Sequence, residues 1–115
     1  MAEHLNPDLL PGTLYMMILR ALRAEPLHGY AIARRIKDAS SQRLVIEDGS
    51  LYPALYRLER KGLIASEWGE SENKRKAKYY SLTATGRKQL KAESESWNRF
   101  SALVAGVLNA LPERS

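Results

Sequence analysis

The architecture of this chain is indicated most clearly by residues 48–62, DGSLYPALYRLERKG. Leucines recur here at the spacing of one helical face: Leu51, Leu55 and Leu58. Asp48 is expected to cap the helix at its start, and Gly62 to follow its last turn, as glycine often does. Pro53 is expected close to the start, where its missing N–H costs little. The stretch therefore predicts a helix with one buried face and one exposed face.

Two β-favouring runs follow this helix, at residues 63–68 and 77–82. In the second run Tyr80 and Leu82 alternate with their neighbours as in a half-buried strand. Residues 69–76 between the runs are charged and contain no apolar side chain. The two runs therefore predict a β-hairpin with a solvated tip.

Two shorter helices are predicted before residue 48. The first follows Pro11 and ends before Pro26, and its apolar stripe consists of Leu14, Met17, Ile18, Ala21 and Leu22. The second is expected over residues 29–39, after a turn at residues 27–29, with one side lined by Tyr30, Ala33 and Ile36. A short β-favouring run lies at residues 44–46. Two helices joined by a glycine-containing turn are typical of a helix-turn-helix, and the hairpin makes it a winged one.

A long final helix is predicted from Thr83, its expected cap, to about Leu111, with Pro112 ending it. Apolar residues recur along it at heptad spacing: Leu90, Trp97, Val104 and Leu111, with Phe100 and Val107 between them and Leu103 and Leu108 beside them. This is the pattern of a seam between helices, but it is too short for a free-standing coiled coil. Either the chain's own domain or a partner subunit covers the seam. A partner is favoured, because the winged unit already has a core.

The composition agrees with one basic domain. The chain has 115 residues, of which 44% are hydrophobic, and a formal net charge of +5. A basic surplus favours a polyanionic partner, with nucleic acid first and an anionic membrane second. Cysteine is absent, so disulfides and thiolate metal sites are excluded. The longest apolar run, at residues 14–19, is too short to span a bilayer, and no basic residue precedes it as in a secretory signal. A cytoplasmic protein is expected.

The positive charge is concentrated near the predicted hairpin tip. No acidic residue interrupts the basic ones between Lys74 and Lys91, and such clustering is what phosphate neutralisation requires. The exposed face of helix 48–62 offers donors and rings to base edges, although Tyr52 and Tyr56 are equally suited to packing at the core edge. The alternative for the basic run is a merely solvated tip. The predicted DNA-contacting residues are Tyr30, Ser50, Tyr52, Pro53, Tyr56, Arg57, Lys74, Arg75, Lys76 and Lys78.

No catalytic or metal-binding constellation is found in the sequence. His4 and His28 have no ligand spacing between them, and the early glycines form no phosphate loop. Glu70 and Glu72 lie in the charged tip, which does not favour acid–base catalysis. We therefore expect no enzyme, no metal and no cofactor.

The predicted fold is mainly α with a small β-hairpin, and thus α+β. Residues 8–83 are expected to form a winged helix-turn-helix DNA-binding domain. Residues 84–111 are expected to form a C-terminal dimerisation helix that makes one compact unit with it.

Several segments together resemble the PadR family of transcriptional regulators. They are LHGY at residues 27–30, GSLYPALYRLE at 49–59, GLI at 62–64, EW at 67–68 and KYYSLT at 78–83, followed by Gly86. The short final helix is similar to the smaller PadR subfamily. The resemblance implies a homodimeric bacterial repressor whose third helix enters the major groove and whose wing contacts the backbone or minor groove. It also implies dimerisation through the last helix, aided by the first, and a small-molecule effector whose identity does not carry over.

A two-fold dimer predicts a pseudo-palindromic operator in double-stranded DNA. The predicted dimer residues are Leu14, Trp97, Phe100, Val104, Val107, Leu108 and Leu111. Trp97 faces the partner, so two indoles near the axis could hold a flat aromatic effector, with Phe100 and either Leu14 or Met17 as walls. Trp97 is equally suited to filling the dimer core alone. A rival function is a winged-helix module that binds protein without specific DNA binding, which the salt dependence of DNA binding distinguishes.

Overall fold

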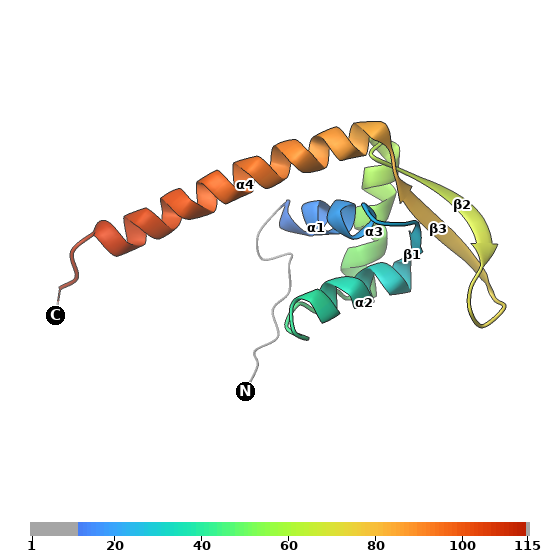
Figure 1. Cartoon of the computed structure of the whole chain (residues 1–115). Helices are drawn as coiled ribbons and strands as arrows, with labels where there is room; N and C mark the ends of the chain where they lie inside the picture. Colours follow the sequence, from blue (N-terminus) through green and yellow to red (C-terminus); the bar gives the residue numbers. More distant parts are fainter. Residues whose placement is uncertain (1–11, 115) are drawn as a thin grey trace.

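In the computed structural model, which describes residues 12–114, four helices and three strands follow one another. They are α1 (Thr13–Ala21), β1 (Leu27–His28), α2 (Gly29–Ala39), α3 (Asp48–Arg60), β2 (Ile64–Glu70), β3 (Lys76–Leu82) and α4 (Ala84–Ala110). Helices α1 to α3 form the body, the β2–β3 hairpin extends from one side, and α4 projects beyond the body (Figure 1). The predicted α+β winged helix-turn-helix is therefore confirmed.

The core of the body consists of leucine and isoleucine side chains from the three helices. The leucine face predicted for α3 is buried, together with Ala54: Leu51, Leu55 and Leu58. In α1 the buried stripe includes Leu19, which the sequence pattern missed, while Met17 and Ala21 are only half-buried. Each fully buried leucine or isoleucine contributes about 1.5–3 kcal/mol of hydrophobic free energy. The core therefore fixes which side of α3 faces outward.

Helix α3 ends at Arg60, and Gly62 follows its last turn as predicted. Gly62 has φ +74°, and its N–H donates to the carbonyl of Glu59 at 3.0 Å. The N–H of Leu63 donates to the carbonyl of Leu58 at 3.0 Å, which completes a Schellman motif. A residue with a Cβ would be strained at this left-handed position.

The start of α3 differs from the prediction in two details. The capping position is Glu47 and not Asp48, which is already the first helical residue. Pro53 lies inside the helix, where it leaves the carbonyl of Gly49 without its usual backbone donor. Proline fixes φ at a helical value, so the helix continues through it.

The three strands form one antiparallel sheet in the order β1-β3-β2. Two predictions are corrected here: residues 44–46 form no strand, and residues 27–28, expected in a turn, form the short third strand β1. Strands β2 and β3 pair from Ile64↔Leu82 to Glu70↔Lys76, so the hairpin tip is shorter than expected. A two-residue strand has no detectable periodicity, which explains why β1 was missed.

The buried side of α2 also differs from the prediction. Its buried residues are Gly29, Ile32 and Ile36, whereas Tyr30 is 68% exposed. The ring of Tyr52 from α3 lies so close to Gly29 that an added Cβ would meet its hydroxyl oxygen at 2.8 Å. Glycine at this position therefore permits α2 and α3 to approach, and Tyr30 is turned outward.

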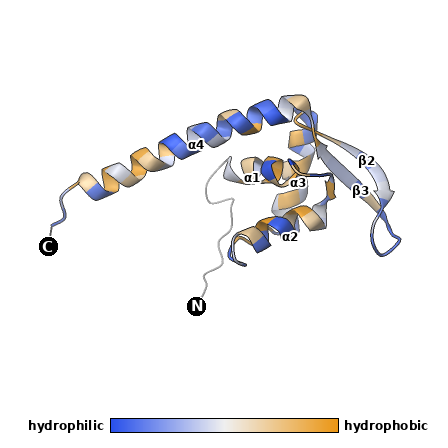
Figure 2. Ribbon diagram, in the orientation of Figure 1, coloured by the Kyte–Doolittle hydropathy of each residue, from blue (hydrophilic) through white to orange (hydrophobic). Residues whose placement is uncertain are grey.

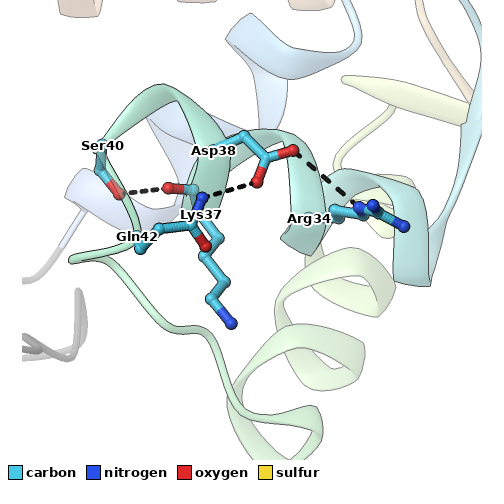
Figure 3. A network of polar contacts seen from close by, with 5 residues as sticks. All are labelled: Arg34, Lys37, Asp38, Ser40 and Gln42. Atoms are coloured by element: carbon cyan, nitrogen blue, oxygen red, sulfur yellow. Dashed lines mark hydrogen bonds and ion pairs between the residues drawn. The ribbon is translucent and has the colours of Figure 1, made fainter.

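The turn between α2 and α3 is held by a polar network around Asp38 (Figure 3). Gln42 donates from Nε2 to one carboxylate oxygen at 3.0 Å, and the other oxygen lies 3.9 Å from Nε of Arg34. The hydroxyl of Ser40 donates to a carbonyl of the last turn of α2 at 2.9 Å. Ser41 and Gln42 have φ of 56° and 71°, which side chains rarely adopt. The network thus stabilises a strained connection between the two helices.

Thr83 joins the body to α4. Its hydroxyl donates to the carbonyl of Gly62 at 2.7 Å and accepts from the N–H of Gly86 at 2.9 Å, so it caps the helix as predicted. Its own N–H donates to the carbonyl of Leu63 at 3.2 Å. A Cβ on Gly86 would overlap that same carbonyl oxygen. The end of α3 and the start of α4 are therefore locked together.

The described chain is more extended than a compact domain of this length. Its radius of gyration is 16.4 Å and its longest extent 60 Å, against about 13 Å expected for the radius of a compact chain. The difference comes from the C-terminal half of α4, which projects away from the body (Figure 1). The predicted beginning of the winged unit at residue 8 and the role of Pro11 lie outside the described residues, and the domain boundaries stay predictions.

Candidate nucleic-acid interface

The outward face of α3 carries aromatic and cationic side chains. Tyr52 is 47% exposed and Tyr56 is 62% exposed. Pro53 and Arg57 are exposed, and Ser50 is half-buried at the first turn. Tyr52 both packs on Gly29 and faces solvent, and its contact with a base stays a prediction.

Arg57 is held by the first helix. Its Nη1 donates to the hydroxyl oxygen of Tyr15 at 3.1 Å. This hydrogen bond, with the charge interaction between the two groups, raises the pKa of the Arg57 guanidinium above its ordinary value. The neighbouring cation Arg60 lies 5.8 Å from the ring centre of Tyr56. Arg57 is thus engaged with the first helix, whereas Tyr56 and Arg60 form a paired, exposed unit.

The β2–β3 hairpin, called the wing below, presents the basic cluster to solvent. Lys74, Arg75 and Lys76 are all exposed. The tip is closed by a bond from the N–H of Ser71 to the carbonyl of Arg75 at 2.8 Å, and Lys74 occupies a left-handed conformation with φ 57°. The three predicted phosphate-contacting cations therefore lie together at the end of a rigid hairpin.

Glu59 connects α3 to the wing, which the sequence did not indicate. Its carboxylate accepts from the hydroxyl of Ser66 at 2.6 Å and pairs with Nζ of Lys78 at 3.5 Å. Lys78 is thereby less free than the tip cations. In the sequence, Glu59 precedes Ser66 by seven residues, and this spacing does not by itself indicate a contact between a helix and a strand. Glu59 fixes the position of the wing relative to α3.

Tyr30 lies at the start of α2, beside the base of the wing. Its ring centre is 6.4 Å from that of His28, which in turn contacts Tyr79 of β3 edge-on at 5.4 Å. The Nδ1 of His28 accepts from the N–H of Ala31 at 3.2 Å and caps α2. Because Tyr52 packs on the neighbouring Gly29, the start of α2 adjoins the exposed face of α3.

Apolar residues recur along the distal half of α4, as its orange segments show in Figure 2, and they are exposed in the single chain. The exposed apolar residues there are Trp97, Phe100, Leu103, Val104, Val107, Leu108 and Leu111. Leu90 is buried against the body. Leu14, predicted in the dimer contact, is instead 4% exposed and belongs to the chain's own core, so that prediction is corrected.

A hollow of about 480 Å³ lies between the start of α1 and the middle of α4. Its lining includes Met16, Trp97 and Phe100. Met17, predicted as a wall with the two aromatic residues, lines a different hollow between α1 and α2. Met16, one position earlier, lines the hollow beside Trp97, because the helical rotation of α1 turns Met17 toward α2.

Within residues 12–114 no group of three or more histidine, aspartate or glutamate side chains could hold a metal ion. No helix in the same part of the chain is long and apolar enough to cross a membrane.

Residues 18–92 match the model of the transcriptional regulator PadR-like family. A PadR family transcriptional regulator from Eggerthella lenta is 36% identical, with a TM-score of 0.77 over 90% of this chain and 88% of that one. A transcriptional regulator from Clostridium thermocellum is 31% identical, with a TM-score of 0.75 over 92% of this chain and 99% of that one. Protein X of Lysinibacillus sphaericus is 30% identical over 78% of this chain and 83% of its own length.

Proposed function

This chain belongs to the PadR-like family of transcriptional regulators, and from that premise we propose that it is a homodimeric repressor. It binds a pseudo-palindromic operator in double-stranded DNA and is released by a small aromatic effector. The observation that carries the proposal is the joined surface of α3 and the wing. Tyr52 and Tyr56 are exposed on the helix, and three exposed cations extend beyond it on a hairpin that Glu59 braces.

Each part of this surface has a separate role. The wing cations supply affinity through phosphate contacts, which carry no sequence information. The exposed side chains of α3 supply specificity by contacting base edges in the major groove. Ser50, Pro53 and Tyr56 lie nearest the beginning and middle of the helix, where a recognition helix contacts bases. Arg57 joins them once it leaves Tyr15.

The wing is tested by replacing Lys74, Arg75 and Lys76 with alanine and measuring binding to selected DNA fragments over a range of salt. Binding should weaken for all sequences, and the slope against log salt should fall by about 2–3 units. The matched control replaces Arg20, Arg23 and Arg99, which are exposed and lie outside the basic run from Lys74 to Lys91, so it removes the same charge away from the wing. If wild-type protein binds no DNA in a salt-dependent manner, the chain is instead a protein-binding winged-helix module.

The dimer is proposed because the apolar side of α4 has no cover in the single chain. Trp97, Val104 and Val107 lie on one side of the helix and are between 38% and 55% exposed. A second copy of α4 buries this surface and places two α3 helices on successive turns of the major groove.

Val104→Glu places a carboxylate in the proposed seam and should convert the dimer to a monomer, as measured by light scattering. The matched control is Ala102→Glu, which adds the same charge on the opposite side of α4. A wild-type monomer at micromolar concentration contradicts the proposal.

The effector is proposed to occupy the hollow beside Trp97. An open, mostly apolar space with two aromatic walls suits a flat aromatic molecule. Planar compounds are screened by tryptophan fluorescence, and hits are tested for release of DNA. Trp97→Ala should abolish release while the protein stays folded and dimeric. If release occurs at the same effector concentration, Trp97 only fills the dimer core.

A further inference from the structure

Trp68 lies on the wing and has no evident role in the fold. It is 63% exposed on β2, so its indole adds little to the core. Tryptophan is highly buried on average, so an indole this exposed leaves a large apolar area available to a partner. The exposed indole is therefore available for contact with a partner.

The strand register places Trp68 on the same side of the wing as α3. Residues that pair across antiparallel strands share a face, so Trp68 lies with Lys78, and Ser66 with Tyr80. Ser66 and Lys78 both contact Glu59 of α3. Trp68 therefore continues the surface of α3 outward along the wing.

The ring also holds one of the wing cations. The ammonium nitrogen of Lys76 lies 5.0 Å from the centre of the Trp68 ring, within the range of a cation–π interaction. A free lysine loses much rotamer freedom when it is fixed on a phosphate. A lysine already held over a ring loses less, so Trp68 prepares Lys76 for contact.

We propose that Trp68 is a DNA-contacting residue of the wing, whose indole lies against the sugar–phosphate backbone and holds Lys76 toward a phosphate. This inference rests on the proposed function, and it adds a DNA contact by Trp68 to those proposed for the three tip cations and for α3. The indole is an apolar plate that covers a deoxyribose, while Lys76 neutralises the adjacent charge. The ligand is duplex DNA, contacted without regard to sequence.

The direct test uses protein labelled with 5-fluorotryptophan, which gives two ¹⁹F signals. The signal that Trp68→Phe removes is that of Trp68. Adding duplex DNA should shift the Trp68 signal and protect it from a soluble quencher, while the Trp97 signal serves as an internal reference. A ring that only stabilises the wing does not change its environment in this way.

The energetic test is a double-mutant cycle on DNA affinity. Trp68→Ala should weaken binding about tenfold, because it removes both the apolar contact with the sugar and the ring that holds Lys76. Trp68→Phe should recover part of the loss, since it retains a ring. Because the ring and the ammonium act together, the double variant with Lys76→Ala should lose less than the product of the two single losses.

The outcomes separate this inference from the proposed function. If the protein binds DNA but the Trp68 signal neither shifts nor becomes protected, the inference is wrong and the proposed function stands. Circular dichroism shows whether Trp68→Ala is unfolded. If it is, the affinity of Trp68→Phe and the ¹⁹F shift of the wild-type protein decide. If wild-type protein binds no DNA, the proposed function itself fails.

Discussion

The hydroxyl of Thr83 joins the end of α3 to the start of α4 through two hydrogen bonds. It donates to the end of α3 at Gly62 and accepts from the start of α4 at Gly86. A helix cap of this type contributes about 1 kcal/mol, and the second bond adds a similar amount. Thr83 therefore stabilises both the helix and its direction.

Thr83→Val keeps the shape of the side chain and removes both hydrogen bonds. We expect the free energy of unfolding to fall by about 1–2 kcal/mol in urea denaturation. Thr85→Val is the matched control, because Thr85 is exposed in the first turn of α4. Equal losses in the two variants contradict a specific role for the Thr83 hydroxyl.

Tyr80 predicts a pH effect at the residue scale. Burial raises the pKa of its phenol above the usual 10.0; Lys78 opposes the increase, while Glu59 and Tyr52 add to it. The folded chain therefore retains this proton at higher pH than the unfolded chain. The stabilisation is fully present below about pH 10 and is lost as pH rises through the raised pKa.

Tyr80→Phe removes this titration, so its melting temperature should decrease less steeply above about pH 10 than that of the wild type. The control is Tyr30→Phe, at an exposed tyrosine, which should keep the wild-type slope. Parallel curves for wild type and Tyr80→Phe show that burial of Tyr80 does not couple to folding.

At the scale of the elements, α4 contains two glycines in opposite situations. A Cβ at Gly86 overlaps the carbonyl oxygen of Leu63, whereas at Gly106 it meets nothing within 4 Å. Gly86→Ala should therefore separate α4 from the body and lower stability by more than about 3 kcal/mol. Gly106→Ala should raise stability by about 0.5–1 kcal/mol, because alanine favours the helix.

Thermal denaturation of both variants checks this prediction. The same substitution in the same helix should then lower stability at Gly86 and raise it at Gly106. A loss of stability in Gly106→Ala indicates that the outer side of α4 is covered in the assembled protein.

The elements were predictable where a repeating pattern was long enough. Leucine spacing identified α3 and its buried face, and Thr83 and Gly62 marked helix ends through local chemistry. The short strand at residues 27–28 has no period, and its pairing with β3 depends on contacts distant in sequence.

The candidate site was only partly predictable for the same reason. The outward face of α3 followed from its buried face, and the wing cations from their clustering. The contact of Tyr52 with Gly29 joins two separate helices, and the hydrogen bond from Arg57 to Tyr15 spans 42 residues. The brace at Glu59 likewise arises only once α3 and β2 are folded together.

For the whole molecule, the proposed dimer makes stability depend on association. The radius of gyration of 16.4 Å reflects a helix half that projects from the body, and in the proposed dimer the partner buries it. The free energy of unfolding in the proposed dimer therefore includes the free energy of association.

The melting temperature should rise by several degrees between about 2 and 200 µM protein, because mass action favours the dimer. Val104→Glu should melt at one temperature throughout this range. A wild-type melting temperature that does not depend on concentration contradicts coupling between folding and association.

The joint at Thr83 also has a geometric consequence. Helix α4 has 27 residues, and at about 1.5 Å per residue it is a lever of roughly 40 Å. A swing of about five degrees at one end displaces the other by roughly 3.5 Å. In the proposed dimer the far ends are anchored on each other, so the displacement appears at the winged units. If the proposed effector tilts α4 slightly, the spacing of the two winged units changes by a larger amount and no longer matches the helical repeat of DNA.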